Sequence, residues 1–171
     1  MCSKGVTLVL LAAFFLQVPF FPDHTDQCGP SVVASVLSFW GTSVTPAELR
    51  QEVYIDHLKG SLSIDLLLAA QKRGYKAHIY SGSMQDLKSE IGEGHPVIAF
   101  LNRGFTLLPV GHYVVITGYD DVRQGLMIHS GMNKNKFISY KRFSGFWDKT
   151  QNSTLLILPP VKDNESDHAG T

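Results

Sequence analysis

Two residues far apart in the chain have side chains that could together perform nucleophilic chemistry. Cys28 stands where a polar loop, 23–27, gives way to an apolar-periodic segment, and His112 follows Gly111 at the start of an apolar run. A thiolate is a strong nucleophile, and an imidazole can take the thiol proton and later return it to a leaving group. Such Cys–His pairs are assembled in space rather than in sequence. These residue types predict acyl-transfer chemistry with Cys28 as nucleophile and His112 as general base.

Each of the two residues also has a purely structural interpretation. Cys28 could be an inert buried thiol, and His112 could simply end a strand. A bridge from Cys28 to Cys2, the other cysteine, is not expected, because small disulfide scaffolds are richer in cysteine. The beginning of a helix favours the chemical interpretation, since its partial positive charge and free N–H groups would stabilise a thiolate and hold an oxyanion. Gly29 would let a substrate backbone approach closely.

The elements that must position these residues follow from periodicity and turn signals. Helices are expected at 28–40, from a capping box at 45–48 onward, at 63–72 and at 83–91. In the third of these helices, Ile64, Leu66, Leu67 and Leu68 are expected to face inward. Strands are expected at 17–21, 75–80, 96–101, 112–119, 126–129 and 154–158. Helices first and strands later predict an α+β fold, with a helical lobe packed on an antiparallel β-sheet.

Length and charge limit the classes of function. The chain has 171 residues, which fits one domain, predicted at 18–160 and followed by a polar, disordered tail at 161–171. Lysine plus arginine equals aspartate plus glutamate at 15 each. Nucleic-acid binding normally needs a basic face, so no nucleic-acid partner is expected.

The N-terminal segment 1–17 has the composition of a signal or anchor. Lys4 precedes an apolar run from Val6 to Leu16, which has the length of a signal-peptide core and is too short for a comfortable transmembrane helix. No small-x-small cleavage site follows it. We expect export to the cell envelope, secretion, or membrane association through this segment. The alternative is a leader without a targeting role, on a protein that stays in the cytoplasm.

Several motifs together carry a family resemblance. They are Val18-Pro19-Phe20-Phe21, the run Asp26-Gln27-Cys28-Gly29-Pro30-Ser31-Val32-Val33-Ala34, Gly94-x-Pro96-Val97-Ile98-Ala99, and Gly111-His112-Tyr113-Val114-Val115-Ile116-Thr117-Gly118-Tyr119-Asp120. Their order and spacing over about 18–131 resemble the bacteriocin-processing peptidases, which are papain-like cysteine peptidases. Members are best known as N-terminal domains of peptide exporters that cut leader peptides after a double glycine, and stand-alone bacterial relatives exist. The resemblance implies a papain-like fold with Cys28 and His112 as its catalytic pair.

The chain departs from that family at two positions. Members carry a Gln five or six residues before the Cys as an oxyanion donor, and here those positions are Asp23 and Pro22. Gln27 could substitute, or could be a solvated loop residue. Members also have an Asp after the strand that follows the Gly-Tyr-Asp turn, where this chain has Ser130. A hydroxyl could orient the imidazole but cannot stabilise the imidazolium as a carboxylate does. Asp120 and Asp121 are interpreted as turn residues.

Two further features leave alternatives open. His24 and Cys28 are spaced like a pair of metal ligands, but no second ligand cluster is visible, so neither a metal nor another cofactor is expected. His129 could end a strand or neighbour the site. The apolar loop 105–110 leads into His112 and could line a cleft or fold onto the core.

Three functions remain compatible with these residues. The first is a cysteine peptidase acting on a peptide or protein, with leader processing as one form of it. The second is an acyl or amide transferase on the same scaffold, since an amine can resolve a thioester. The third is a catalytically weak relative that binds peptides, which the two departures favour. The chain has neither a nucleotide-binding loop nor a set of membrane spans, so any exporter is expected to be a separate chain.

Overall fold

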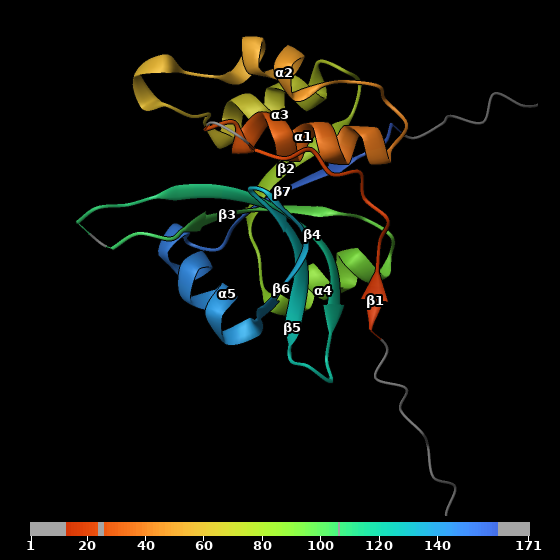
Figure 1. Cartoon of the computed structure of the whole chain (residues 1–171). Helices are drawn as coiled ribbons and strands as arrows, with labels where there is room; N and C mark the ends of the chain where they lie inside the picture. Colours follow the sequence, from red (N-terminus) through yellow and green to blue (C-terminus); the bar gives the residue numbers. More distant parts are fainter. Residues whose placement is uncertain (1–12, 24–25, 106, 161–171) are drawn as a thin grey trace, which may run out of the picture.

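An antiparallel sheet of seven strands is the scaffold of the molecule (Figure 1). The structure is a computed structural model, and it describes residues 13–23, 26–105 and 107–160. The strands are β1 Phe14–Phe15, β2 Lys76–Ser81, β3 Val97–Asn102, β4 Gly111–Asp120, β5 Gly125–Ser130, β6 Asn133–Ser139 and β7 Ser153–Leu158. Their order is β2-β7-β3-β4-β5-β6, and β1 pairs with the far end of β4. The predicted α+β architecture is confirmed.

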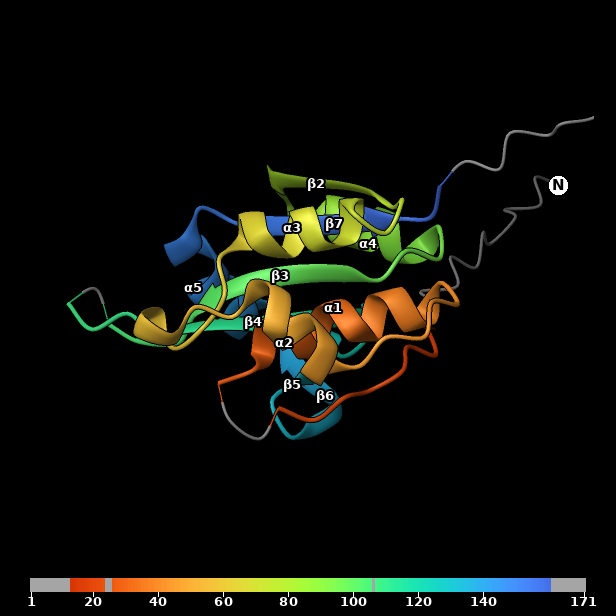
Figure 2. The ribbon, with the colours of Figure 1, turned by 90° about the horizontal axis from the view of Figure 1, so that it is seen from above.

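Helices cover the sheet on both sides. They are α1 Cys28–Phe39, α2 Pro46–Val53, α3 Ser63–Gln71, α4 Met84–Gly92 and α5 Tyr140–Trp147, with the 3₁₀ turns η1 Asp56–Leu58 and η2 Asp148–Thr150. In Figure 1, α1 to α3 lie above the strands, and α4 and α5 lie below them. Viewed from above in Figure 2, α1 and α3 lie across the sheet, and α2 lies against those two helices. The predicted helical lobe is therefore the layer formed by α1 to α3.

The core is densest where α1 crosses β4. Helix α1 has an almost continuous buried run from Gly29 to Leu37. Strand β4 is buried from His112 to Gly118, as expected for a strand covered on both faces. Because α1 contacts β4 along this core, the first residue of the helix and the first residues of the strand are held by the same packing.

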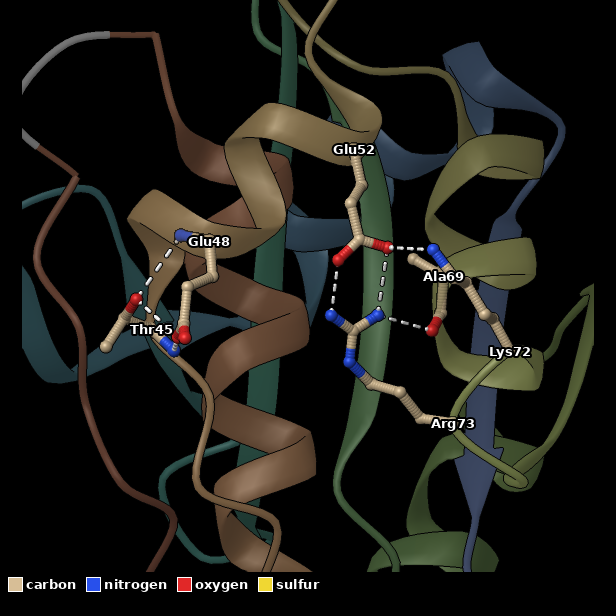
Figure 3. A network of polar contacts seen from close by, with 6 residues as sticks. All are labelled: Thr45, Glu48, Glu52, Ala69, Lys72 and Arg73. Atoms are coloured by element: carbon tan, nitrogen blue, oxygen red, sulfur yellow. Dashed lines mark hydrogen bonds and ion pairs between the residues drawn. The ribbon is translucent and has the colours of Figure 1, made fainter.

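The outer helices of the lobe are fixed by caps and by a charged contact (Figure 3). The predicted capping box at the start of α2 is present, with Thr45 Oγ1 accepting from the Glu48 N–H and the Glu48 carboxylate accepting from the Thr45 N–H. Arg73, just beyond α3, donates to both carboxylate oxygens of Glu52 on α2, and this bonding lowers the pKa of Glu52. Partly exposed ion pairs contribute little to stability, so this contact orients α2 and α3 more than it stabilises them.

Three expectations about the elements are wrong in detail. The extended segment 17–21 is not a strand, and pairing begins earlier, at Phe14 and Phe15, inside the predicted leader 1–17. Leu16 is buried in the core, so the domain starts before residue 18. In α3 only one narrow stripe is buried, which leaves Ile64 and Leu68 exposed rather than inward.

Two elements were not expected from the sequence. Strand β6 alternates between asparagine and lysine over its first four residues, and its two apolar residues, Phe137 and Ile138, are adjacent rather than alternating. Helix α5 is short and begins directly after β6, with Ser139 capping its first turn. Residues 1–12 and 161–171 lie outside the described residues, so the signal and tail remain predictions. Among the helices that the structure describes, none has the length and apolar character needed to cross a membrane.

Candidate active site

Cys28 is the first residue of α1. Pro30 follows in the first turn, where its missing N–H is not needed, and Gln27 precedes the helix without a side-chain cap. The loop before the helix is tied down from two sides. The Gln27 N–H donates to Asp23 Oδ1 over 2.8 Å, and the Asp23 N–H donates to the Gly131 carbonyl over 3.1 Å. Cys28 itself is a free, half-buried thiol.

His112 enters the site from the start of β4 and meets Ser130 at the end of β5. The two strands are neighbours in the sheet, which brings the side chains together. His112 Nε2 lies 3.0 Å from Ser130 Oγ, and both residues are buried. If Nε2 carries the proton and donates to Oγ, the Nδ1 lone pair is available to accept a proton. The predicted contact between Ser130 and the imidazole is therefore present.

Three potential donor atoms converge at this point. An oxygen of Asp23, Sγ of Cys28 and a ring nitrogen of His112 all lie within 4.8 Å of one another. The predicted pair is thus brought together, and no hydrogen bond between Cys28 and His112 is recorded among the described residues. Such contacts commonly tighten only when substrate is bound. The carboxylate of Asp23 is the addition that the sequence did not reveal.

The surroundings hold Cys28 in its thiol form. Burial raises the pKa of Cys28 above its ordinary value, and the negative charge of Asp23 acts in the same direction. Backbone hydrogen bonds from Tyr113 and Gly29 and the charge of Arg103 oppose this rise without cancelling it. We expected the helix N-terminus to stabilise a thiolate, but the pKa of Cys28 is raised, because burial outweighs the backbone hydrogen bonds that lower it.

His112 is neutral over the physiological range. Burial lowers the pKa of His112 to about 4, and the positive charges of Arg103 and Lys136 contribute. A neutral imidazole beside a neutral thiol is not a preformed ion pair. In this arrangement the proton would move from sulfur to nitrogen as the sulfur attacks, with His112 as general base.

Two neighbours of Cys28 were expected to take part in the reaction, and the structure corrects the expectation for Gly29. Gly29 is buried against the helical lobe, and a Cβ built on it would lie 3.0 Å from Ser61 and 3.2 Å from Leu66. Its missing side chain therefore serves helix packing rather than substrate approach. Gln27 contributes its backbone N–H to Asp23, and an oxyanion role for its side chain stays a prediction.

His129 supports the segment that carries the loop before α1. It lies near the end of β5, is buried, and its Nε2 is 3.0 Å from the Val18 carbonyl. Its Nδ1 accepts from the Asn135 N–H, and its ring packs edge-on against Phe20. His129 also lines a small pocket at Cys28, of about 240 Å³ with its open mouth included. It is both a strand-end residue and a neighbour of the site.

The remaining acidic candidates are engaged elsewhere. Asp120 caps the turn after β4, where Oδ1 accepts from the Arg123 N–H, and Asp121 binds Lys88 and the Tyr140 hydroxyl. Neither is an orienting partner of His112, in agreement with their interpretation as turn residues.

Among the described residues, two groups have the composition of a three-ligand metal site. They are the Asp23, Cys28 and His112 cluster and a partly exposed cluster of Glu90, Glu93 and His95. His24, the histidine considered as a ligand from the sequence, lies outside the described residues. Because a bound metal ion would change the reactivity of the Cys28 thiol, that reactivity should be measured in a buffer that contains a chelator.

The apolar loop before His112 does not fold onto the core. Leu107 is 90% exposed and Phe105 is 81% exposed. The loop is the tip of the β3–β4 hairpin, which projects from the molecule at the left of Figure 1. That alternative is therefore wrong, and contact with a substrate remains to be tested.

The fold has several solved relatives. The peptidase domain of Streptococcus ComA, a bifunctional ABC transporter involved in quorum sensing, is 24% identical with a TM-score of 0.69, covering 84% of this chain and 99% of that domain. A protein from Bacillus anthracis described as a C39-like peptidase is 17% identical with a TM-score of 0.71, covering 88% and 100%. A double glycine motif protease from an AMS/PCAT transporter, solved with its leader peptide, is 21% identical with a TM-score of 0.69, covering 85% and 94%.

Sequence comparison agrees with this fold. No curated protein matches the chain. The family model for the Peptidase_C39 like family matches residues 15–155, which include Cys28, His112 and Ser130. This matched range begins within β1 and ends within β7, so it spans the whole sheet. The chain therefore belongs to the Peptidase_C39 like family, and its fold is that of the C39 papain-like peptidases.

Proposed function

We propose that the protein is a cysteine peptidase that cleaves a peptide through Cys28 and His112. The observation that carries the proposal is the convergence of Cys28 Sγ and a His112 ring nitrogen within 4.8 Å, with Ser130 bonded to Nε2. Family membership supports a hydrolase of this kind.

The proposed reaction has two steps. As the Cys28 sulfur attacks the scissile carbonyl, His112 takes the thiol proton, the S–C bond forms and the carbonyl electrons move to oxygen. Collapse breaks the C–N bond, and His112 gives the proton to the leaving amine, which leaves a thioester. Water, deprotonated by His112, then hydrolyses the thioester and restores the thiol. The Cys28 N–H at the start of α1 is suited to hold the oxyanion.

We further propose that the substrate has small residues before the scissile bond, as a double-glycine leader has. Two of the structural relatives are described as a double glycine motif protease with its leader peptide and as the peptidase domain of a transporter. The pocket at Cys28 is narrow and walled by Phe20, Phe21 and Tyr113, which favours glycine or alanine over a larger side chain. An exporter as partner follows only if the substrate is an exported peptide.

A peptide-binding protein with weak catalysis is the second candidate. It is favoured by the carboxylate of Asp23 beside the sulfur, which raises the pKa of Cys28 and would repel a developing oxyanion. The peptidase and the peptide-binding protein would both hold a peptide in the same cleft, but only the peptidase would cleave it efficiently.

The deciding experiment measures labelling and cleavage on one protein. In a Cys2→Ser background, a peptide aldehyde or chloromethyl ketone ending in Gly-Gly should label Cys28, and a matching fluorogenic peptide should be cleaved. Cys28→Ser should abolish labelling, and His112→Ala should lower cleavage by at least 100-fold. Ser38→Ala is the matched control, since Ser38 lies in the last turn of α1 and does not line the pocket at Cys28. Labelling without turnover would establish the binding candidate, and labelling that survives Cys28→Ser would exclude Cys28 as the reactive residue.

A further inference from the structure

A basic pocket of about 1030 Å³, its open mouth included, adjoins the candidate site. Three cations line it: Arg103 just beyond β3, Lys136 on β6 and Arg142 on α5. The other lining residues are apolar or hydroxyl-bearing, namely Leu101, Ile128, Ser130, Phe137, Ile138, Ser139 and Phe146. No acidic residue is among them. The pocket therefore combines positive charge with an apolar floor.

The three cations are not neutralised by the protein. None of them takes part in a salt bridge or a side-chain hydrogen bond within the described part of the chain. The one contact that the structure records for their charged groups is Arg142 over the Phe146 ring, at 5.9 Å. Three unpaired cations around one concave surface attract an anion, and a carboxylate can bind a guanidinium through two hydrogen bonds.

Ser130 connects this pocket to the catalytic pair. It lines both the basic pocket and the small pocket at Cys28, and its hydroxyl contacts His112 Nε2. The charges of Arg103 and Lys136 act on His112 directly. The residue that orients His112 is thus neutral, and the positive charges of Arg103 and Lys136 are unfavourable for an imidazolium.

We propose that the basic pocket binds a carboxylate of the peptide substrate, and that this carboxylate offsets the positive charges of the pocket that act on His112. The proposal rests on the proposed peptidase function and names its substrate class. The carboxylate neutralises Arg103 and Lys136 while the substrate is bound. His112 then accepts the thiol proton more readily, so an acidic substrate is both held and turned over better than its amide counterpart.

The test compares matched peptides in a fluorogenic cleavage assay. The peptides come in pairs that differ by glutamate or glutamine at one position, and the position is moved in turn along both sides of the scissile bond. Each peptide is made once with a free C-terminus and once with an amidated C-terminus. These two arms separate a side-chain carboxylate from a terminal one. We expect one carboxylate to raise kcat/KM about tenfold or more, in kcat as well as in KM, because hydrogen bonds to charged groups are among the stronger ones. Equal rates for all pairs would overturn the proposal.

Variants then place the effect in this pocket. Arg142→Ala should reduce the acid preference, measured as the ratio of acid to amide cleavage rates, several-fold. Lys141→Ala is the matched control, because Lys141 is an exposed neighbour on α5 that does not line the pocket. An acid preference that survives both Arg142→Ala and Lys136→Ala would overturn the proposal.

A charge placed in the protein should replace that of the substrate. Ser130→Asp should raise cleavage of the amide peptides and bring the ratio of acid to amide rates close to one. An undiminished ratio would count against the catalytic part of the proposal.

A binding measurement tests the pocket without catalysis and without the Ser130→Asp variant. Calorimetry with the Cys28→Ala protein should show that the acidic peptide binds more weakly at high salt than at low salt. Salt-sensitive binding without cleavage by the wild type would reject the peptidase function and keep the pocket. Cleavage without acid preference would keep the peptidase and reject the pocket.

Discussion

At the scale of single residues, Asp23 is the side chain that most distinguishes this site from an efficient cysteine peptidase. It occupies one of the positions where the resemblance leads one to expect an oxyanion-donating glutamine, and its carboxylate lies beside the Cys28 sulfur. Two consequences follow from its negative charge. It disfavours the thiolate, and it disfavours the oxyanion that the attack would create.

Asp23→Asn should therefore activate the protein. Removing the charge lowers the pKa of Cys28, so the rate of Cys28 alkylation at pH 7.5 should rise several-fold, and the midpoint of the rate against pH should move down. The new amide can also donate to an oxyanion, so kcat should increase. Asp26→Asn is the control, since Asp26 is exposed and its backbone conformation suits asparagine. An unchanged pH profile in Asp23→Asn would show that Asp23 does not control the thiol.

His112 should make the fold sensitive to acid. The pKa of His112 is about 4 in the folded protein, against about 6.5 in an unfolded chain, so the unfolded chain binds a proton more readily. Its contribution to stability is intact above pH 6.5 and is lost as pH falls toward 4. When the pH is lowered from 7.5 to 4.5, the unfolding free energy measured in urea should fall by about 2 kcal/mol more in the wild type than in His112→Gln. Equal losses of unfolding free energy in the two proteins would mean that the pKa of His112 is not lowered in the folded state.

The places of Cys28 and His112 in the fold could be predicted from the sequence, but their electrostatics could not. Cys28 at a helix start and His112 at a strand start are local signals, and both proved correct in position. The effects of Asp23, Arg103 and Lys136 depend on how distant segments fold together, and burial decides the sign of the thiol shift. A sequence shows a residue's type and its element, whereas the field at an atom is a property of the assembled fold.

At the scale of elements, the start of α1 is set by its packing against the segment that leads into α3. Gly29 is the point of closest approach, since a Cβ there would meet Ser61 and Leu66. Tyr113, the next residue after His112, also donates its hydroxyl toward the Ser61 carbonyl and shares a hydrogen bond with Ser63. The helix that carries Cys28 and the strand that carries His112 are therefore braced against the same segment.

Gly29→Ala should disturb this brace. The added methyl group needs Ser61 and Leu66 to move by a few tenths of an ångström, so we expect a loss of about 1 kcal/mol in unfolding free energy and slower Cys28 alkylation. Gly145→Ala in α5 is the matched control, because a Cβ there meets nothing within 4 Å and alanine favours a helix. If both variants gain stability equally, close packing does not explain glycine at position 29.

Elements with strong local signals could be predicted, and elements that depend on their partners could not. The capping box at Thr45 and the long helical face of α1 determine their helices from nearby residues alone. Strand β6 and the two-residue β1 instead exist because β5 and β4 offer them unpaired edges. Their residues carry no apolar alternation, so tertiary pairing overrides the local pattern there.

At the scale of the whole molecule, exposed apolar side chains gather at the end where the site lies. The tip of the β3–β4 hairpin carries Phe105, Leu107 and Leu108, and the segment between α2 and α3 carries Leu58 and Leu62, all exposed. Figures 1 and 2 both show these two segments projecting from the same end of the molecule. Apolar groups exposed together commonly mark a binding surface.

The hairpin is held firmly at its base, which makes it suited to present its tip. The Asn102 side chain accepts from the N–H groups of Gly104 and Val110, both at 2.9 Å, and Lys149 Nζ donates to the Gly104 carbonyl. Val110 lies two residues before His112, so a peptide that reaches the catalytic pair from this side passes the hairpin. The apolar side chains of the tip do not contribute to the core and are free to contact a bound molecule.

Replacing Leu107 and Leu108 together by serine should weaken substrate binding and spare the fold. Since both side chains are largely exposed, the unfolding free energy should change by less than about 0.5 kcal/mol. KM for a peptide with apolar residues upstream of the bond should rise about tenfold with kcat little changed, because the lost contacts are made equally in the ground and transition states. Val122→Ser is the matched control, since Val122 is equally exposed in the turn at the other end of β4. A KM that stays constant in the hairpin variant, or rises as much in the control, would show that the substrate does not contact the hairpin, and the apolar surface would then have to be assigned to another partner.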